Sequence, residues 1–295
     1  MDLFQVVGAF GGGVFGAAVG ALPAFVITSV LAIAGGVLSM AGLPDVSIGN
    51  ITFGAFLGPH VIFASGVAAA AYAARKGIHD HGANVAVPLN GLKDPGTLLV
   101  GGIFGVIGIL LKYFFQITLH LDGSWIAYVA SDPPSLSLIT SAIIVRLFIA
   151  RQGLFGDFEK GEHKIMPDAK SASYTILLGC AYGLVTSGVG ISLMHQGVDV
   201  SSYPVLCFGI AGVGLVFAQT GSAYFVCHHI LLPAAMAAVL SGNIIVGTIT
   251  GGACAIIGLF VENIFNQFDH VRSHIDPPAF TIIVVTFVLH AIFGG

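Results

Sequence analysis

Two histidines at matching positions are the side chains of this chain best suited to bind a solute or to move a proton. His60 lies in FLGPHVIFASGVAAAAY (residues 56–72) and His228 lies in YFVCHHILLPAAMAAVL (residues 224–240), and the two stretches align without a gap. Other polar residues precede each histidine: Asn50 and Thr52 the first, and Gln219, Thr220 and Ser222 the second. Polar side chains within apolar runs are costly in a membrane and by default indicate function.

A break in the helical pattern comes just before each histidine. Gly58-Pro59 interrupts the first apolar run, and the polar turn 219–222 interrupts the second. Such breaks direct backbone groups and a helix N-terminus at the membrane centre, where imidazole can hydrogen-bond a solute or relay protons. We therefore predict that these residues bind a small polar or anionic solute. The structural alternative is that each histidine bonds a carbonyl group of a neighbouring helix.

Three charged residues also lie within apolar runs. Arg146 is permanently charged and lies about a turn before Arg151, so we expect it to bind a substrate or a lipid headgroup, or to form a structural ion pair. Lys112 and Glu262 should lie near opposite faces of the membrane, where their side chains can reach the interface. Glu262, which has two asparagines nearby on its helix, could instead line a cytoplasmic vestibule.

No enzyme or cofactor motif is present in the chain. The sequence contains no G-x-S-x-G, H-E-x-x-H or Walker A pattern. Cys227, His228 and His229 are adjacent, and adjacent helical residues point about 100° apart, which disfavours a shared metal ion. The four cysteines lie in apolar runs without C-x-x-C spacing and are expected to be free thiols. We expect no cofactor and no metal.

The composition is that of a helical membrane protein. Of 295 residues, 56% are hydrophobic and 8% are charged, whereas ordinary soluble domains contain about 25% charged residues. The apolar runs are long enough for membrane-spanning helices, and the 41 glycines allow such helices to approach closely. The net charge of −4, without a basic patch, excludes a nucleic-acid partner. Membrane lipids are the expected surroundings, and the glycine-rich faces are compatible with a homo-oligomer.

An internal repeat organises the chain. Residues 101–115, GGIFGVIGILLKYFF, correspond to residues 251–265, GGACAIIGLFVENIF, and the motif Asp-Pro-Pro occurs at 132–134 and again at 276–278. Asp caps a helix and Pro fits its first turn, so each motif predicts a helix start. We predict two related halves: residues 1–151, a charged cytoplasmic linker at 152–171, and residues 172–295.

About ten membrane spans are expected, five in each half. They are 4–22, 24–42, 51–74, 97–119, 134–151, 172–194, 203–218, 222–240, 244–266 and 278–294. The run from Leu3 to Leu43 is divided at Pro23 in this interpretation; a kinked helix with a re-entrant segment is the alternative. In the third span, a short segment at 48–57 would meet a longer helix that begins near Pro59.

The basic residues fix the orientation of this arrangement. The loops after spans three, five, seven and nine would contain all the Lys and Arg residues outside the spans: Arg75, Lys76, Lys93, Arg151, Lys160, Lys164, Lys170 and Arg272. This side is therefore cytoplasmic, and both termini would lie outside. Because each half has an odd number of spans, the second half enters the membrane inverted relative to the first, a common arrangement in transporters and some channels.

We therefore predict an all-α, polytopic transmembrane bundle of the prokaryotic inner membrane, built as a five-plus-five inverted repeat. Its expected function is transport of a small molecule or ion, as a channel or a secondary transporter. Two alternatives remain. One is a membrane-embedded enzyme that uses His60, His228 and a carboxylate, and the other is a non-catalytic subunit or scaffold of a larger complex.

Overall fold

The protein is all-α in the part of the chain that the structure describes. The computed structural model describes residues 1–43, 51–118, 132–159 and 161–293, and helices and connecting turns account for them. The longer helices are α1 (Leu3–Val19), α2 (Ala21–Met40), α4 (Pro59–Arg75), α5 (Pro95–Thr118), α7 (Pro133–Ile144), α8 (Ala169–His195), α9 (Tyr203–Val213), α11 (His228–Ser241), α12 (Ile244–Phe265) and α13 (Pro277–Phe293). The shorter elements are η1 (Asn90–Leu92), the π-helical turn η2 (Val145–Ile149), α10 (Leu215–Gln219) and η3 (Phe268–His270).

Four helices are long and apolar enough to cross a membrane: α2, α5, α8 and α12. Shorter apolar helices surround them, and large hydrophobic side chains such as Leu177, Val185 and Ile249 are exposed on the outer surface. An apolar exterior of this kind suits a lipid environment. These features support the membrane class that the composition predicts. The number of spans is part of the function proposed below.

Local sequence signals mark where several helices begin. Asp132 accepts a hydrogen bond from the Ser135 amide at 3.0 Å and caps α7. Asp276 caps α13 in the same way, through the Ala279 amide at 2.9 Å. Pro59 stands at the first position of α4, and Gly58 before it is extended. The two Asp-Pro-Pro motifs and Gly58-Pro59 therefore start helices where the sequence predicts them.

The division between the first two helices lies at Gly20, three residues before the predicted break at Pro23. Gly20 has a φ of +89°, which an L side chain rarely adopts, and a Cβ there would lie 2.7 Å from the Val87 carbonyl oxygen. Pro23 lies in the first turn of α2, where its missing amide hydrogen has no consequence. Later in the chain, the predicted span 222–240 is helical only from His228 onward.

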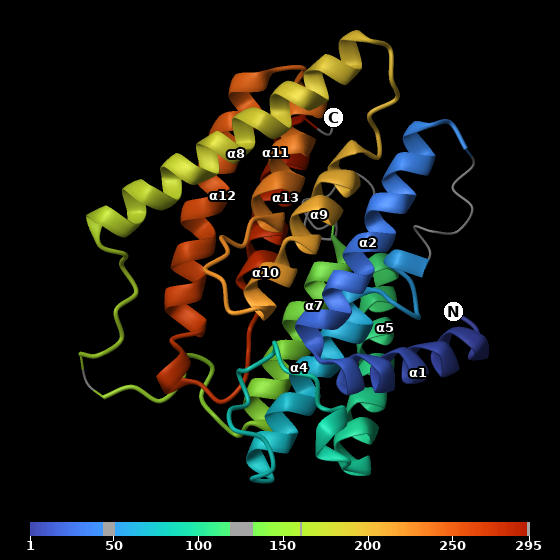
Figure 1. Ribbon diagram of the computed structural model, residues 1–295, viewed down its shortest axis with the longest axis vertical. Helices are drawn as coiled ribbons and strands as arrows, with labels where there is room; N and C mark the ends of the chain where they lie inside the picture. Colours follow the sequence, from blue (N-terminus) through green and yellow to red (C-terminus); the bar gives the residue numbers. More distant parts are fainter. Residues whose placement is uncertain (44–50, 119–131, 160, 294–295) are drawn as a thin grey trace.

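The same packing pattern occurs twice in the molecule. α1 packs on α4 and α5, and these two pack on each other; α8 packs likewise on α11 and α12, which also pack on each other. α2 packs against α9, and α7 packs against α13, which joins the two groups. In Figure 1, α4 and α7 lie in the lower part of the molecule and α11 and α13 in the upper part.

Glycines allow the closest helix contacts within each group. A Cβ on Gly16 of α1 would collide with the Ile62 carbonyl oxygen of α4, and one on Gly105 of α5 would collide with the Ala9 carbonyl oxygen of α1. In the other group, Gly179 of α8 faces the Gly251 carbonyl oxygen of α12. Small residues at these points let the helix backbones touch.

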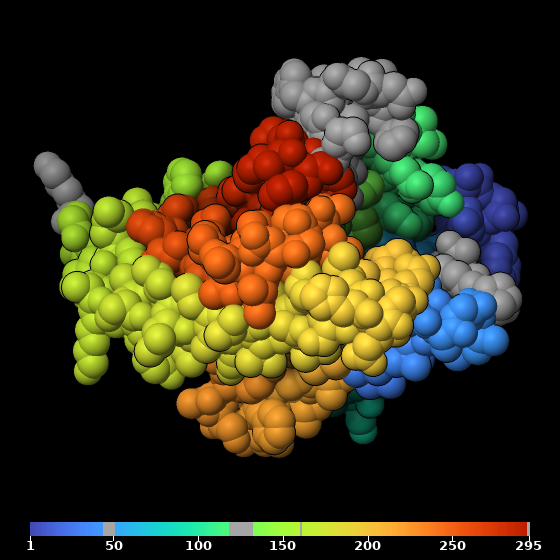
Figure 2. All heavy atoms as spheres, turned by 90° about the horizontal axis from the view of Figure 1, so that it is seen from above, coloured from blue at the N-terminus to red at the C-terminus, as the bar shows by residue number. Residues whose placement is uncertain are grey.

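α4 forms the centre of the N-terminal group. All but three of its 17 residues are buried, because helices pack around it on several sides. The space-filling view in Figure 2 shows the N-terminal helices, in blue, at one end of the molecule and the yellow-green segment that follows residue 150 at the other.

Candidate functional site

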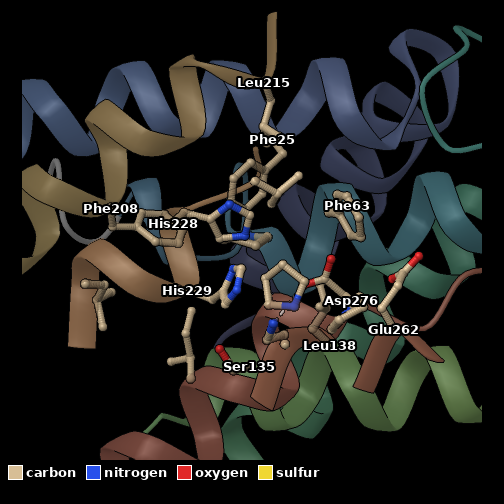
Figure 3. A pocket seen from close by; sticks show the side chains of 18 of the residues that line it. Phe25, Phe63, Ser135, Leu138, Phe208, Leu215, His228, His229, Glu262 and Asp276 are labelled. Atoms are coloured by element: carbon tan, nitrogen blue, oxygen red, sulfur yellow. Dashed lines mark hydrogen bonds between the residues drawn. The ribbon is translucent and has the colours of Figure 1, made fainter. Parts of the chain in front are cut away.

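The candidate site is a cavity of about 410 Å³ between the two helix groups (Figure 3). Side chains from α2, α4 and α7 line it on one side, and side chains from α8 to α13 line the rest. Its polar lining residues are Asp132, Ser135, Thr175, Tyr224, His228, His229, Glu262, His274 and Asp276. Its aromatic walls include Phe25, Phe53, Phe63, Phe208 and Phe225. A mostly apolar cavity with a few polar groups is typical of small-molecule sites.

Several helices of the described chain have first-turn residues in the cavity wall. Among them are Pro59 of α4, Pro134 of α7, His228 of α11 and Pro277 of α13. Helix N-termini carry partial positive charge from unpaired amide groups. In α7 and α13 the capping aspartates, Asp132 and Asp276, already accept hydrogen bonds from some of these amide groups. The cavity therefore combines helix N-termini with carboxylates in one apolar space.

His228 and His229 form the enclosed part of this site. The two side chains are only 5% and 6% exposed, and the Nδ1 atom of each is buried without a hydrogen-bond partner among the described residues. The His228 ring lies 4.9 Å from the ring of Phe25 and 5.7 Å from that of Phe208, measured between centroids. A buried, unpaired ring nitrogen loses hydration without compensation, so each ring has one nitrogen atom that its present surroundings leave unsatisfied.

Asp276, His274 and Glu262 form the acidic part of the wall. The His274 Nε2 atom lies 3.4 Å from the Asp276 carboxylate. Burial raises the pKa of this carboxyl, but the hydrogen bond and charge of His274 bring it below its ordinary value. Glu262 is exposed at the mouth of the wall, and its carboxylate accepts a hydrogen bond from the Asn266 side-chain amide at 3.3 Å. The wall thus has a negative charge that no described Lys or Arg neutralises.

Asp132 contributes a second carboxylate from the other helix group. It accepts hydrogen bonds from both the amide and the hydroxyl of Ser135, at 3.0 and 2.9 Å, and Ser135 also lines the cavity. The two Asp-Pro-Pro motifs therefore serve as helix caps and as parts of one cavity wall.

Sequence comparison gives a family for this chain. The chain matches the family of unknown function DUF7973 over residues 1–173 and over residues 166–294. It belongs to that family. No curated protein and no solved structure matches it.

The two histidines predicted as a pair have different surroundings. His228 lines the cavity, whereas His60 does not. His60 is fully buried in α4, and neither ring nitrogen has a hydrogen-bond partner among the described residues. Gly58 lies against its ring, and Gly108 of α5 lies against its carbonyl group. The cavity partner of His228 is its neighbour, His229.

Arg146 lies outside the cavity wall and binds backbone carbonyl groups. Its guanidinium donates to the carbonyl oxygens of Leu154, Phe265 and Ser273 and to the Ser273 hydroxyl, at 2.7 to 3.0 Å. It is fully buried in the π-helical turn η2. These contacts join α7 to the segment between α12 and α13. The geometry is that of a structural clamp.

The remaining predicted residues are dispersed. Thr52 is buried, and its hydroxyl has no partner among the described residues, but it does not line the cavity. Gln219 ends α10, and Thr220 and Ser222 are exposed on the turn that follows, where their hydroxyls lie 3.4 Å apart. Asn50 lies outside the described residues.

The sequence interpretation omitted three important residues of the cavity: His229, Glu262 and Asp276. His229 was set aside because it is adjacent to His228, yet the first turn of α11 brings both rings into the wall. Asp276 was interpreted only as a cap. Glu262 was interpreted as a side chain that reaches the membrane interface, with a place in a cytoplasmic vestibule as the alternative. Lys112, the counterpart of Glu262 in the repeat, donates to the Phe53 carbonyl oxygen at 2.7 Å instead.

The site does not resemble a metal centre. Among the described residues, no group of three His, Cys, Asp or Glu side chains is placed to hold a metal ion. The cavity can accept hydrogen-bond donors, hold protons on its acids and imidazoles, and enclose apolar groups.

Proposed function

We propose that this protein is a membrane transport protein that moves a small solute through the cavity between two inverted repeats. The observation that carries the proposal is the cavity itself, which both helix groups line and which has histidines and carboxylates in its wall. Solute sites in repeat transporters lie between the repeats, near helix N-termini. A scaffold has no need of such a space.

The ten-span inverted repeat is the architecture that we propose for this function. The packing of α1, α4 and α5 on one another has its counterpart in α8, α11 and α12. α2 packs on α9 and α7 packs on α13, as expected for equivalent helices related by a twofold axis. The family match is likewise divided into two segments, 1–173 and 166–294, which meet near the end of the predicted linker.

The proposed membrane orientation places the basic loops in the cytoplasm of a prokaryotic cell. Hydrogen bonds join these loops: the Arg75 guanidinium donates to the Ile149 carbonyl oxygen at 3.2 Å, and the Arg272 amide donates to the Gln152 side chain at 2.8 Å. Arg272 also pairs with Asp157 at 2.9 Å. Basic residues gathered on one side favour a cytoplasmic location of that side.

Thiol labelling from each side of the membrane tests this proposal. Ser135 lines the cavity, so Ser135→Cys introduces a thiol there. Ser141 is buried on the same helix outside the cavity wall, so Ser141→Cys is the matched control. The unmodified chain, with its four native cysteines, gives the background. A charged, membrane-impermeant thiol reagent is added to intact cells and to inverted membrane vesicles.

We expect Ser135→Cys to react from both sides and Ser141→Cys from neither. Transport requires that the cavity open to each side in turn. A thiol that reacts from neither side would favour a scaffold, and one that reacts from a single side would indicate a closed-ended pocket. Either result would contradict the proposed function.

A further inference from the structure

The charges in the cavity wall identify the class of solute. The titratable residues of the described wall are Asp132, Tyr224, His228, His229, Glu262, His274 and Asp276, and no Lys or Arg is among them. Lys112 and Arg146, the two cations within the predicted spans, donate to carbonyl oxygens elsewhere. A permanent anion would therefore find neither an ammonium nor a guanidinium group in this wall. An organic cation would find carboxylates.

The aromatic side of the cavity also suits a cation. Phe25 is the centre of a group of rings, with centroids 5.9 Å from Phe63, 5.4 Å from Phe208 and 4.9 Å from His228. Aromatic faces attract cations through their quadrupole, and they bury the apolar part of an amphiphilic ligand. Figure 3 shows Phe25 above the two histidines, Phe208 on the left and Phe63 on the right, with Asp276 and Glu262 at the lower right.

Glu262 is the carboxylate best placed to pair with a ligand. Asp132 and Asp276 are already engaged with helix amides, whereas Glu262 lies late in α12 and does not cap a helix. Its side chain is exposed and, among the described residues, accepts a hydrogen bond from the Asn266 side-chain amide. At the enclosed end, the side chains of His228 and His229 line the cavity and add two more ring systems to its wall.

We propose that the cavity binds an aromatic organic cation and exchanges it for protons. This inference rests on the proposed transport function and names its substrate class. Protons and the cation compete for the same groups. As the pH falls, the carboxylates of Glu262, Asp132 and Asp276 in the cavity wall lose negative charge, and this loss opposes binding of a cation. Protons entering from one side therefore release the cation, and proton loss at the other side restores binding.

Binding of 1-methyl-4-phenylpyridinium is the first test. This probe has a fixed positive charge, so any pH dependence belongs to the protein. Binding is measured on the full chain in lipid nanodiscs between about pH 5.5 and 8, and biphenyl-4-carboxylate serves as the anionic probe of similar shape. We expect the cation to bind about tenfold more tightly at the high end of this range, and the anion to bind at neither end.

Two matched pairs of variants locate the binding. Glu262→Gln removes a cavity charge, and Glu159→Gln makes the same change at an exposed position outside the wall. Phe208→Leu removes an aromatic face, and Phe148→Leu does so at a side chain that is 68% exposed on the outer surface. We expect the cavity variants to weaken binding of the cation about tenfold or more, and the controls to stay within about twofold. Thermal unfolding of each variant reports whether it is folded.

The outcomes separate this inference from the proposed function. If the anion binds and the cation does not, or if neither probe binds, the substrate class is wrong, and cavity labelling of Ser135→Cys from both sides would still support transport. Binding of the cation that is independent of pH, or unchanged in both cavity variants, would also overturn the exchange proposed here. If labelling fails from both sides, the transport function and the exchange fall together.

Discussion

His60 has a costly environment, since both of its ring nitrogens are buried without a described hydrogen-bond partner. His228 has one such nitrogen, but its ring lies at the wall of an open space. Histidines at equivalent positions of the sequence pattern can thus be packed between helices in one half and line the cavity in the other. The neighbouring residues decide which of these happens.

Replacement of His60 by Leu is expected to leave the protein at least as stable as before. An unpaired buried polar group costs about 1 to 3 kcal/mol, and an apolar side chain of similar volume removes that cost. The unfolding temperature in detergent should stay the same or rise, and affinity for 1-methyl-4-phenylpyridinium should stay within about twofold. His228→Leu, in contrast, should change the affinity. If His60→Leu lost binding and His228→Leu did not, His60 would belong to the binding site.

Arg146 is expected to be essential for stability. Arg146→Ala leaves the carbonyl groups of Leu154, Phe265 and Ser273 without their donor, and should lower the free energy of unfolding by about 3 kcal/mol or more. Arg146→Lys should recover part of this loss, because one ammonium group cannot reach all of these oxygens.

Chemical unfolding in mixed micelles measures both Arg146 variants. Arg151→Ala is the control, since Arg151 is exposed and its replacement should cost no more than about 0.5 kcal/mol. An Arg146→Ala protein as stable as the control would rule out the clamp.

The glycine contacts of α1 show how one helix face is specified. Gly16 and Gly11 lie on the same helix, but a Cβ on Gly16 would collide with the α4 backbone at Ile62, and a Cβ on Gly11 would touch nothing within 4 Å. Gly16→Ala should therefore destabilise the protein by about 2 kcal/mol. Gly11→Ala should stabilise it by about 0.5 to 1 kcal/mol, because Ala favours helix over Gly. Thermal unfolding of the two variants side by side checks this, and equal shifts would contradict the contact.

Helix starts were largely predictable from the sequence, because their causes are local. Pro59 and the two Asp-Pro-Pro motifs each begin a helix, since capping and the geometry of proline act within a few residues. The break at Gly20 was predicted at Pro23, because the strained φ of Gly20 depends on its contact with the distant Val87.

The cavity was less predictable than the helices. Its carboxylates come from Asp132, Glu262 and Asp276, which lie on separate elements, and only tertiary packing brings them together. The pattern of matching histidines identified one cavity residue, His228. It could not distinguish a ring that faces the cavity from one enclosed between α4 and its neighbours.

At the scale of the whole molecule, the gathering of basic loops on one side leads to a prediction about topology. Alkaline phosphatase, which is active only after export, should be active when fused to the C-terminus and inactive when inserted at Gly161. A Cβ on Gly161 would meet nothing within 4 Å, so this position is suited to an insertion. The physical reason is the basic linker around it, which favours the cytoplasm. Enzyme activity in whole cells is the measurement, and the reverse pattern would contradict the orientation.

The Arg146 clamp also constrains the order in which the chain is assembled. Two of its acceptor residues, Phe265 and Ser273, follow Arg146 by 119 and 127 residues. Arg146 is therefore synthesised long before these oxygens exist. During that interval water or the translocation machinery must solvate the charge. α7 can therefore reach its final position only after α12 and the segment that follows it have been synthesised. Folding of the first half of the protein is finished only when its last third is present.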